Sequence, residues 1–130
     1  MTSREWNTAV GTGLLRLGAG AALLRWRKPL AHRLAGASAD DTVVPMLFGY
    51  FGVRDVLVGL VTLASTRPDA DVRKAVRLQG HADATDALLV TAVMRSGRIP
   101  QRQGIAAIAV AAGSAVSEYV TAVALKRSSP

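Results

Sequence analysis

The stretch GVRDVLVGL, residues 52–60, places an arginine and an aspartate side by side within an otherwise apolar segment. No other residue between Val43 and Ser65 is charged. A segment of this length suffices for an α-helix to cross a bilayer, which takes about 20 predominantly apolar residues. Ionised side chains are costly at such a depth unless they face one another or other polar groups. Arg54 and Asp55 therefore predict a helix that carries a buried polar site.

Three further segments approach the same length, so we expect helices at about residues 6–26, 43–65, 72–94 and 104–125. The stretches VVPMLFGYFGV (43–53) and GIAAIAVAAGSAV (104–116) have no charged face, and a helix that is apolar all round is buried or in lipid. A domain of 130 residues rarely has room to bury several such helices. The sequence predicts one all-α domain, residues 1–130, with four transmembrane helices in an up-down bundle and both termini on the same side. A soluble four-helix bundle is the alternative, because segment 72–94 alone would pass as amphipathic.

The formal net charge is +7, and the basic residues are grouped between the apolar segments, as at positions 25, 27, 28 and 33 and again at 95, 98 and 102. This grouping is typical of loops that flank membrane spans and meet anionic headgroups, whereas a nucleic-acid site is one continuous basic surface. We expect membrane lipids, and no nucleic acid, as partners of an integral protein of the bacterial cytoplasmic membrane. The chain has no cysteine, which excludes thiolate metal sites, and its single histidine among the carboxylates predicts neither a metal site nor a cofactor.

Ionisable residues occur inside every predicted helix: Arg16 near the middle of the first, Arg54 and Asp55 near the middle of the second, His81, Asp83 and Asp86 in the third, and Glu118 in the last third of the fourth. Two of the charges are flanked by small residues on the same helix face, Arg16 by Gly13 and Gly20, and Asp55 by Gly52 and Gly59. Such stripes let helix backbones approach closely in lipid. We therefore expect one shared polar core near the middle of the membrane.

Pairing between arginines and carboxylates accounts for much of this core, but two arginines face four carboxylates. The two surplus acids are candidates for function, and we expect Asp83 and Asp86, three residues apart on one face, to share a proton. The candidate catalytic residues are Asp83, Asp86, Asp55 and Glu118. The candidate substrate-binding residues are Arg54, Arg16, His81 and Tyr50, although His81 is predicted to point away from the Asp83 face.

The stretch FGYFGVRDVLVGLVTLA followed by HADATDALLV resembles a family of small bacterial four-helix membrane proteins defined as a domain of unknown function. The shared elements are a Gly-x-Arg-Asp motif in the second helix, here Gly52, Arg54 and Asp55, and an aspartate in the third, here Asp83 or Asp86. The similarity covers roughly residues 8–125 and rests on short motifs. It implies the membrane fold and no activity, and neither His81 nor Glu118 matches its pattern.

Three classes of function remain open. The first is a membrane-embedded protein that binds a lipophilic small molecule and transforms it by acid/base chemistry, as an isomerase, a cyclase or an epoxide-opening enzyme. The second is a small proton-coupled transporter, which would need a homodimer to enclose a path. The third is a non-catalytic subunit or assembly factor of a larger membrane complex. The surplus carboxylates favour the first, which predicts a ligand-sized cavity lined by the four carboxylates.

Overall fold

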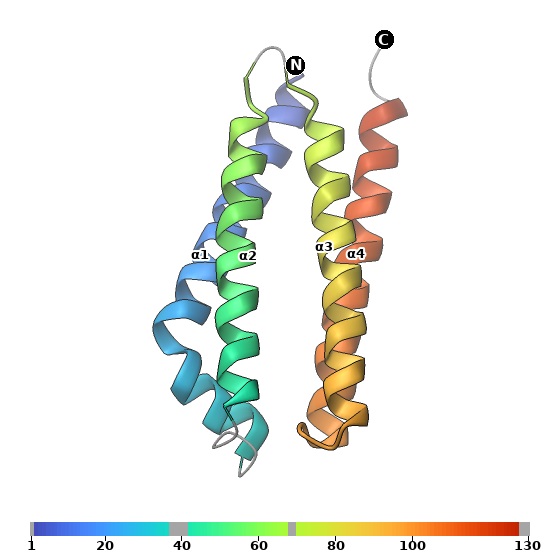
Figure 1. The fold of residues 1–130 in the computed structure, drawn as a ribbon. Helices are drawn as coiled ribbons and strands as arrows, with labels where there is room; N and C mark the ends of the chain where they lie inside the picture. Colours follow the sequence, from blue (N-terminus) through green and yellow to red (C-terminus); the bar gives the residue numbers. More distant parts are fainter. Residues whose placement is uncertain (1, 37–41, 68–69, 128–130) are drawn as a thin grey trace.

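The computed structural model describes residues 2–36, 42–67 and 70–127, and these residues form four helices and no strand. The helices are α1 (Ser3–Ala35), α2 (Val43–Ala64), α3 (Val72–Arg95) and α4 (Gln101–Arg127). Consecutive helices run in opposite directions, and the first turn of α1 lies at the same end of the bundle as the last turn of α4 (Figure 1). The predicted all-α, up-down architecture is confirmed.

Helix α1 is longer than the sequence indicated. It continues past Trp26, where the backbone is non-helical (φ −116°, ψ 21°), to Ala35. Pro29 lies inside the helix just after this position; it lacks an amide donor and its ring crowds the preceding turn, which kinks a helix. The basic residues at positions 25, 27, 28 and 33 are therefore helical, and their assignment to a loop is wrong.

Side chains cap the starts of α1 and α3. Thr2 and Glu5 form a reciprocal capping box at the start of α1. The side chain of Asp71 accepts hydrogen bonds from the backbone amides of Arg73 and Lys74 at the start of α3.

Helices α1 and α2 pack as a hairpin whose backbones nearly touch. A Cβ atom added to Gly20 would lie 2.6 Å from the carbonyl oxygen of Gly52, and one added to Gly59 would lie 2.8 Å from that of Gly13. These four positions are the small residues predicted to allow close packing, and the contacts confirm it. Helices α3 and α4 form a second hairpin, in which Gly80 lies against the ring of Tyr119.

The two hairpins meet in three layers along the bundle axis. At the end that carries the termini, five apolar residues from α1, α3 and α4 form a buried cluster: Ala9, Val72, Val76, Ala122 and Leu125. At the opposite end, Ala31 and Val44 are buried against Phe48 and Ile99. Between these apolar layers the buried side chains include Arg16, Asp55, Asp83 and Asp86, which form ion pairs across the interface.

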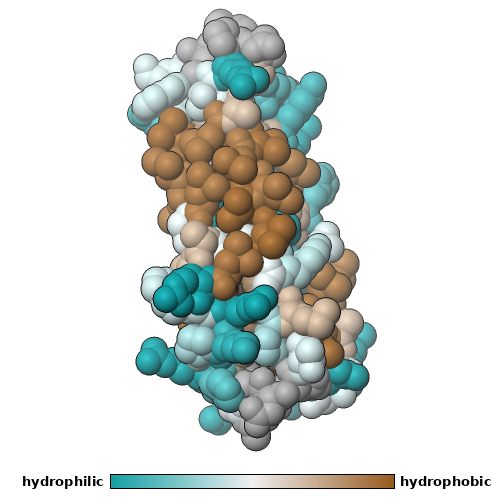
Figure 2. Space-filling view, turned by 60° about the vertical axis from the view of Figure 1, so that its left-hand side comes forward, coloured by the Kyte–Doolittle hydropathy of each residue, from teal (hydrophilic) through white to brown (hydrophobic). Residues whose placement is uncertain are grey.

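The outer faces of α2 and α4 are apolar. Exposed large hydrophobic residues follow the outer face of α2 (Met46, Tyr50, Val53, Leu57, Leu60 and Val61) and that of α4 (Ile105, Val116, Val120 and Val123). Figure 2 shows apolar side chains gathered over the α1 and α2 side, with hydrophilic residues above and below them. Two helical segments, Val43–Ala64 and Gln101–Leu125, are long and apolar enough to cross a membrane. Only 33% of the most apolar stretch of the first segment is buried, and only 17% of that of the second. Most of the apolar surface of these two segments therefore faces outward from the bundle.

Candidate functional site

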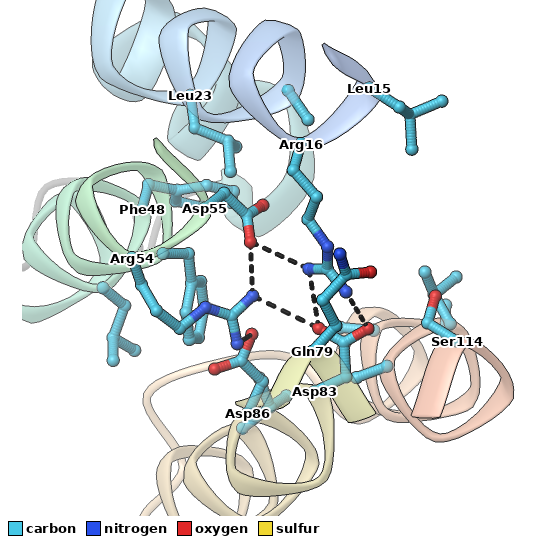
Figure 3. A pocket seen from close by; sticks show the side chains of 18 of the residues that line it. Leu15, Arg16, Leu23, Phe48, Arg54, Asp55, Gln79, Asp83, Asp86 and Ser114 are labelled. Atoms are coloured by element: carbon cyan, nitrogen blue, oxygen red, sulfur yellow. Dashed lines mark hydrogen bonds and ion pairs between the residues drawn. The ribbon is translucent and has the colours of Figure 1, made fainter. Parts of the chain in front are cut away.

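Charged side chains from all four helices meet in the middle layer (Figure 3). The guanidinium of Arg16 on α1 contacts one carboxylate from each of the other helices. Its Nη1 lies 2.9 Å from Asp55 Oδ1 on α2, and its Nη2 lies 2.5 Å from Asp83 Oδ2 on α3 and 2.6 Å from Glu118 Oε1 on α4. Arg16 is 8% exposed, so these ion pairs are shielded from solvent. The predicted shared polar core is present.

Arg54 on α2 makes the matching set of contacts. Its Nη2 lies 2.6 Å from Asp55 Oδ1 and 3.3 Å from Asp83 Oδ1, and its Nη1 pairs with Asp86 Oδ2 and donates to the carbonyl oxygen of Ala82. Arg16, Asp55, Arg54 and Asp83 therefore form a closed ring in which each arginine contacts both aspartates (Figure 3). With both aspartates ionised the ring is neutral, and we call it the Arg–Asp ring.

Asp86 and Glu118 are the two acids in excess of the Arg–Asp ring. Each is attached by one oxygen to one of the arginines, Asp86 to Arg54 and Glu118 to Arg16. The other oxygens, Asp86 Oδ1 and Glu118 Oε2, are buried and have no hydrogen-bond partner. Buried polar atoms are rarely left unpaired, so each of these two oxygens is a position at which the site could accept a further hydrogen bond. The sequence predicted two surplus acids and favoured Asp83 and Asp86 as a proton-sharing pair, but the contacts place Asp83 in the ring and leave Asp86 and Glu118 in excess.

A second polar layer lies one helical turn from the ring, towards the termini. Gln79, which is 1% exposed, donates from Nε2 to Thr62 Oγ1 at 2.6 Å and lies 3.5 Å from Thr12 Oγ1. Thr12 and Thr62 are site residues that were not predicted from the sequence. Their signal was spacing, because Thr12 precedes Arg16 by one turn and Thr62 follows Asp55 by two, which places each on the face of the charge it accompanies.

A pocket of about 650 Å³ lies next to these polar residues. Gln79 lines it, and so do the six charged residues, which we call the charged cluster: Arg16, Arg54, Asp55, Asp83, Asp86 and Glu118. Its walls are mostly apolar and come from every helix and from the α3–α4 connection: Leu15, Leu23, Val44, Leu47, Phe48, Phe51, Val90, Ile99, Ala107, Val110 and Ala111. The four carboxylates expected to line a ligand-sized cavity, Asp55, Asp83, Asp86 and Glu118, do so.

Two predicted substrate-binding residues lie outside this pocket. His81 is exposed on the outer face of α3, where its Nδ1 lies 2.6 Å from the hydroxyl of Tyr119. Tyr50 is 49% exposed and packs edge-on against Phe51. The structure therefore brings together Arg16, Arg54 and the four carboxylates, but not His81 or Tyr50.

Comparison of the chain with protein-family models, with curated proteins and with solved structures finds no match. The resemblance based on the Gly-x-Arg-Asp motif stays a prediction, and the functional argument rests on the geometry of the pocket.

Proposed function

We propose that this chain is an integral membrane protein with four transmembrane helices whose pocket binds a lipophilic small molecule at the charged cluster. The observation that carries the proposal is the pocket itself. Its volume is about 650 Å³, its walls are mostly apolar, and six charged residues line it. Pockets that bind small molecules in proteins have volumes of roughly 300–1,000 Å³ and combine apolar walls with a few convergent polar groups.

The distribution of apolar and charged residues supports the membrane part of the proposal. Helices α1 and α3 contain mid-helix charges, but Arg16, Asp83 and Asp86 lie inside the bundle and are at most 8% exposed. These three charges are therefore not presented to the surroundings of the bundle. A polar interior within an apolar exterior is the arrangement that hydrocarbon favours, since lipid provides no partner for a charged group.

The surplus acids give the pocket a means of proton transfer. A double-bond isomerisation needs one protonated and one ionised carboxyl group. The first donates its proton to one carbon of the substrate, the second removes a proton from another carbon, and the substrate gains and loses one proton. Asp86 and Glu118 suit these roles because each keeps one oxygen that the arginines do not use. Cyclisation and epoxide opening use the same initial protonation.

The Arg–Asp ring favours a second candidate, a non-catalytic membrane subunit. The ring joins α1 to α3 and α2 to α3, so it holds the two hairpins together without any ligand. In that case the charged residues would specify the assembly of the bundle, and the pocket would be filled by lipid chains. Whether the pocket selects a compact apolar molecule separates the two candidates.

A matched pair of variants tests the proposal. Ala111 lines the pocket, whereas its neighbour Ala112 is exposed and does not line it. Protein in lipid nanodiscs would be photolabelled with adamantane diazirine, an uncharged apolar probe, and the labelled residues identified by mass spectrometry. We expect Ala111→Phe to reduce labelling of Phe48 in the pocket and Ala112→Phe to leave it unchanged. Labelling of Leu57, on the outer face of α2, serves as the internal reference.

Two outcomes would contradict the proposal. Equal labelling of Phe48 in both variants would mean that the probe does not enter the pocket. Labelling of Phe48 that fails to saturate with probe concentration, as at Leu57, would mean that the pocket holds bulk lipid and would favour the non-catalytic subunit.

A further inference from the structure

The pocket contains more negative than positive charge. Among the residues that line it, the cations are Arg16 and Arg54, against four carboxylates. The remaining polar lining residues, Thr12, Gln79, Gln103 and Ser114, are uncharged. If every carboxyl group is ionised, the Arg–Asp ring is neutral and Asp86 and Glu118 leave two negative charges at the pocket.

Neither arginine is available to bind an anion. Arg16 already contacts three carboxylates, and Arg54 contacts three carboxylates and a backbone carbonyl oxygen. One atom of Arg54, Nε, has no hydrogen-bond partner, but it belongs to a guanidinium whose charge is taken up by those carboxylates. An anionic ligand would therefore meet a net negative surface at close range, which disfavours its binding.

The unpaired acceptors point to a donor. Asp86 Oδ1 and Glu118 Oε2 are buried acceptors without a partner, and both residues line the pocket. Hydrogen bonds between an ionised carboxylate and an ammonium group are about twice as strong as those between neutral groups. Phe48 and Phe51 also line the pocket, and aromatic faces attract cations.

From these observations we propose that the pocket takes a lipophilic organic cation, an apolar body that carries an ammonium group, with the N–H donors bound by Asp86 or Glu118. This inference rests on the proposed function, because it names the class of lipophilic molecule that the pocket holds. The positive charge offsets the negative charge of Asp86 and Glu118, and the apolar body occupies the walls formed by residues such as Val90, Ile99 and Val110.

Three probes with the same hydrocarbon body test the charge of the ligand: adamantylammonium, adamantanol and adamantanecarboxylate. Their affinities for the protein in nanodiscs would be measured by isothermal titration calorimetry at pH 7, with empty nanodiscs as the blank. We expect adamantylammonium to bind about tenfold more tightly than adamantanol, and adamantanecarboxylate to bind least tightly. The variant with both Asp86→Asn and Glu118→Gln should bind the ammonium and the alcohol with affinities that differ less than about twofold, while Ala112→Phe should keep the wild-type ratio.

The possible results separate this inference from the proposal on which it rests. If adamantanol or adamantanecarboxylate binds as tightly as adamantylammonium, the cation assignment is wrong and the lipophilic pocket remains. If none of the three binds above the blank, both are wrong. If the ammonium preference persists in the double variant, the cation is held elsewhere and the assignment to Asp86 and Glu118 fails; the wild-type comparison decides the ligand class even where the double variant does not fold.

Discussion

Arg16 and Asp83 face each other through two hydrogen bonds, Nη1 to Oδ1 at 2.8 Å and Nη2 to Oδ2 at 2.5 Å. Because Arg16 belongs to the first hairpin and Asp83 to the second, this two-bonded pair fixes the position of one hairpin against the other. Bidentate arginine–carboxylate pairs are geometrically demanding as well as strong. The energetic consequences of this pair, and of the ring around it, can be measured.

Removal of Arg16 should destabilise the bundle severely. Arg16→Met leaves three buried carboxylates without one of their cations, and breaking a buried ion pair in this way costs about 3–5 kcal/mol. Arg77 is exposed on α3, so Arg77→Met should change stability by less than about 0.5 kcal/mol. Thermal unfolding of both variants in the same detergent checks this. Similar midpoints for the two would contradict a structural role for the ring.

The close approach of α1 and α2 predicts opposite effects at two neighbouring glycines. A Cβ atom at Gly20 would meet backbone atoms of Gly52 and Val56 at 2.6 and 2.8 Å, so Gly20→Ala must push the helices apart and should cost about 1–3 kcal/mol. Nothing lies within 4 Å of a Cβ atom at Gly18. Gly18→Ala should stabilise the helix by up to about 1 kcal/mol. Denaturation in mixed detergent micelles would show the two midpoints moving in opposite directions, and a shift in the same direction would disprove the contact.

The sequence predicted the architecture because the determinants were local. The sequence alone shows the apolar segments of span length, the glycines three and four residues from a charge, and the turns between the segments. The end of α1 was not predictable in this way, because the basic residues after Trp26 resemble a loop in sequence but are helical. Helix formers on both sides of Pro29 keep the chain helical there, and the proline produces a kink in place of an end.

The composition of the site was predictable, but its pairing was not. The charges in the core could be counted from the sequence, which is why two surplus acids were expected. Which acids these are depends on how the helices rotate against one another, since Asp83 reaches both arginines while Asp86 reaches only Arg54. His81 was included because it is ionisable and close to Asp83 in sequence, yet it faces outward to Tyr119.

The cap of α3 should make stability depend on pH in the acid range. Partial burial raises the pKa of the Asp71 carboxyl, but hydrogen bonds from Arg73 and from the backbone amide of Lys74 outweigh it and hold the pKa below its ordinary value of 3.8. A group whose pKa is lowered by folding stabilises the protein above its unfolded pKa and loses that effect as the pH falls through its folded pKa. Asp71→Ala should therefore cost about 1 kcal/mol at pH 7, and the difference from wild type should shrink below pH 3.8. Unfolding midpoints of both proteins from pH 7 to pH 3 measure it; a constant difference would rule out ionisation of Asp71 as the cause.

The proposed four spans predict which positions water-soluble reagents reach. The chain contains no cysteine, so single cysteines can be introduced into an otherwise unreactive background. In sealed vesicles, a membrane-impermeant maleimide should react with Ala70→Cys and Ser96→Cys from opposite sides, because these positions lie in the connections at opposite ends of the bundle. Leu57→Cys, on the outer face of α2, should react only after the membrane is dissolved and the protein denatured. Rapid labelling of Leu57→Cys in intact vesicles would exclude a membrane-spanning α2.

The last prediction separates the ring from the surplus acids with one substitution made at two positions. Both oxygens of Asp83 accept hydrogen bonds, Oδ1 from Arg16 and Arg54 and Oδ2 from Arg16, so either orientation of an asparagine amide would set its N–H groups against those of an arginine. Asp83→Asn should therefore cost about 3 kcal/mol or more.

At Asp86 only Oδ2 contacts Arg54 and Oδ1 is unpaired. In Asp86→Asn the amide oxygen can keep the contact with Arg54, while the amide nitrogen occupies the position of the unpaired Oδ1. That variant also removes one of the two acids in excess of the Arg–Asp ring, so we expect its stability to lie within about 1 kcal/mol of wild type or above it. Thermal unfolding of the two variants at pH 7 decides the matter. If Asp86→Asn is as damaging as Asp83→Asn, then Asp86 belongs to the structural ring, and Glu118 alone remains available for proton transfer or for a bound cation.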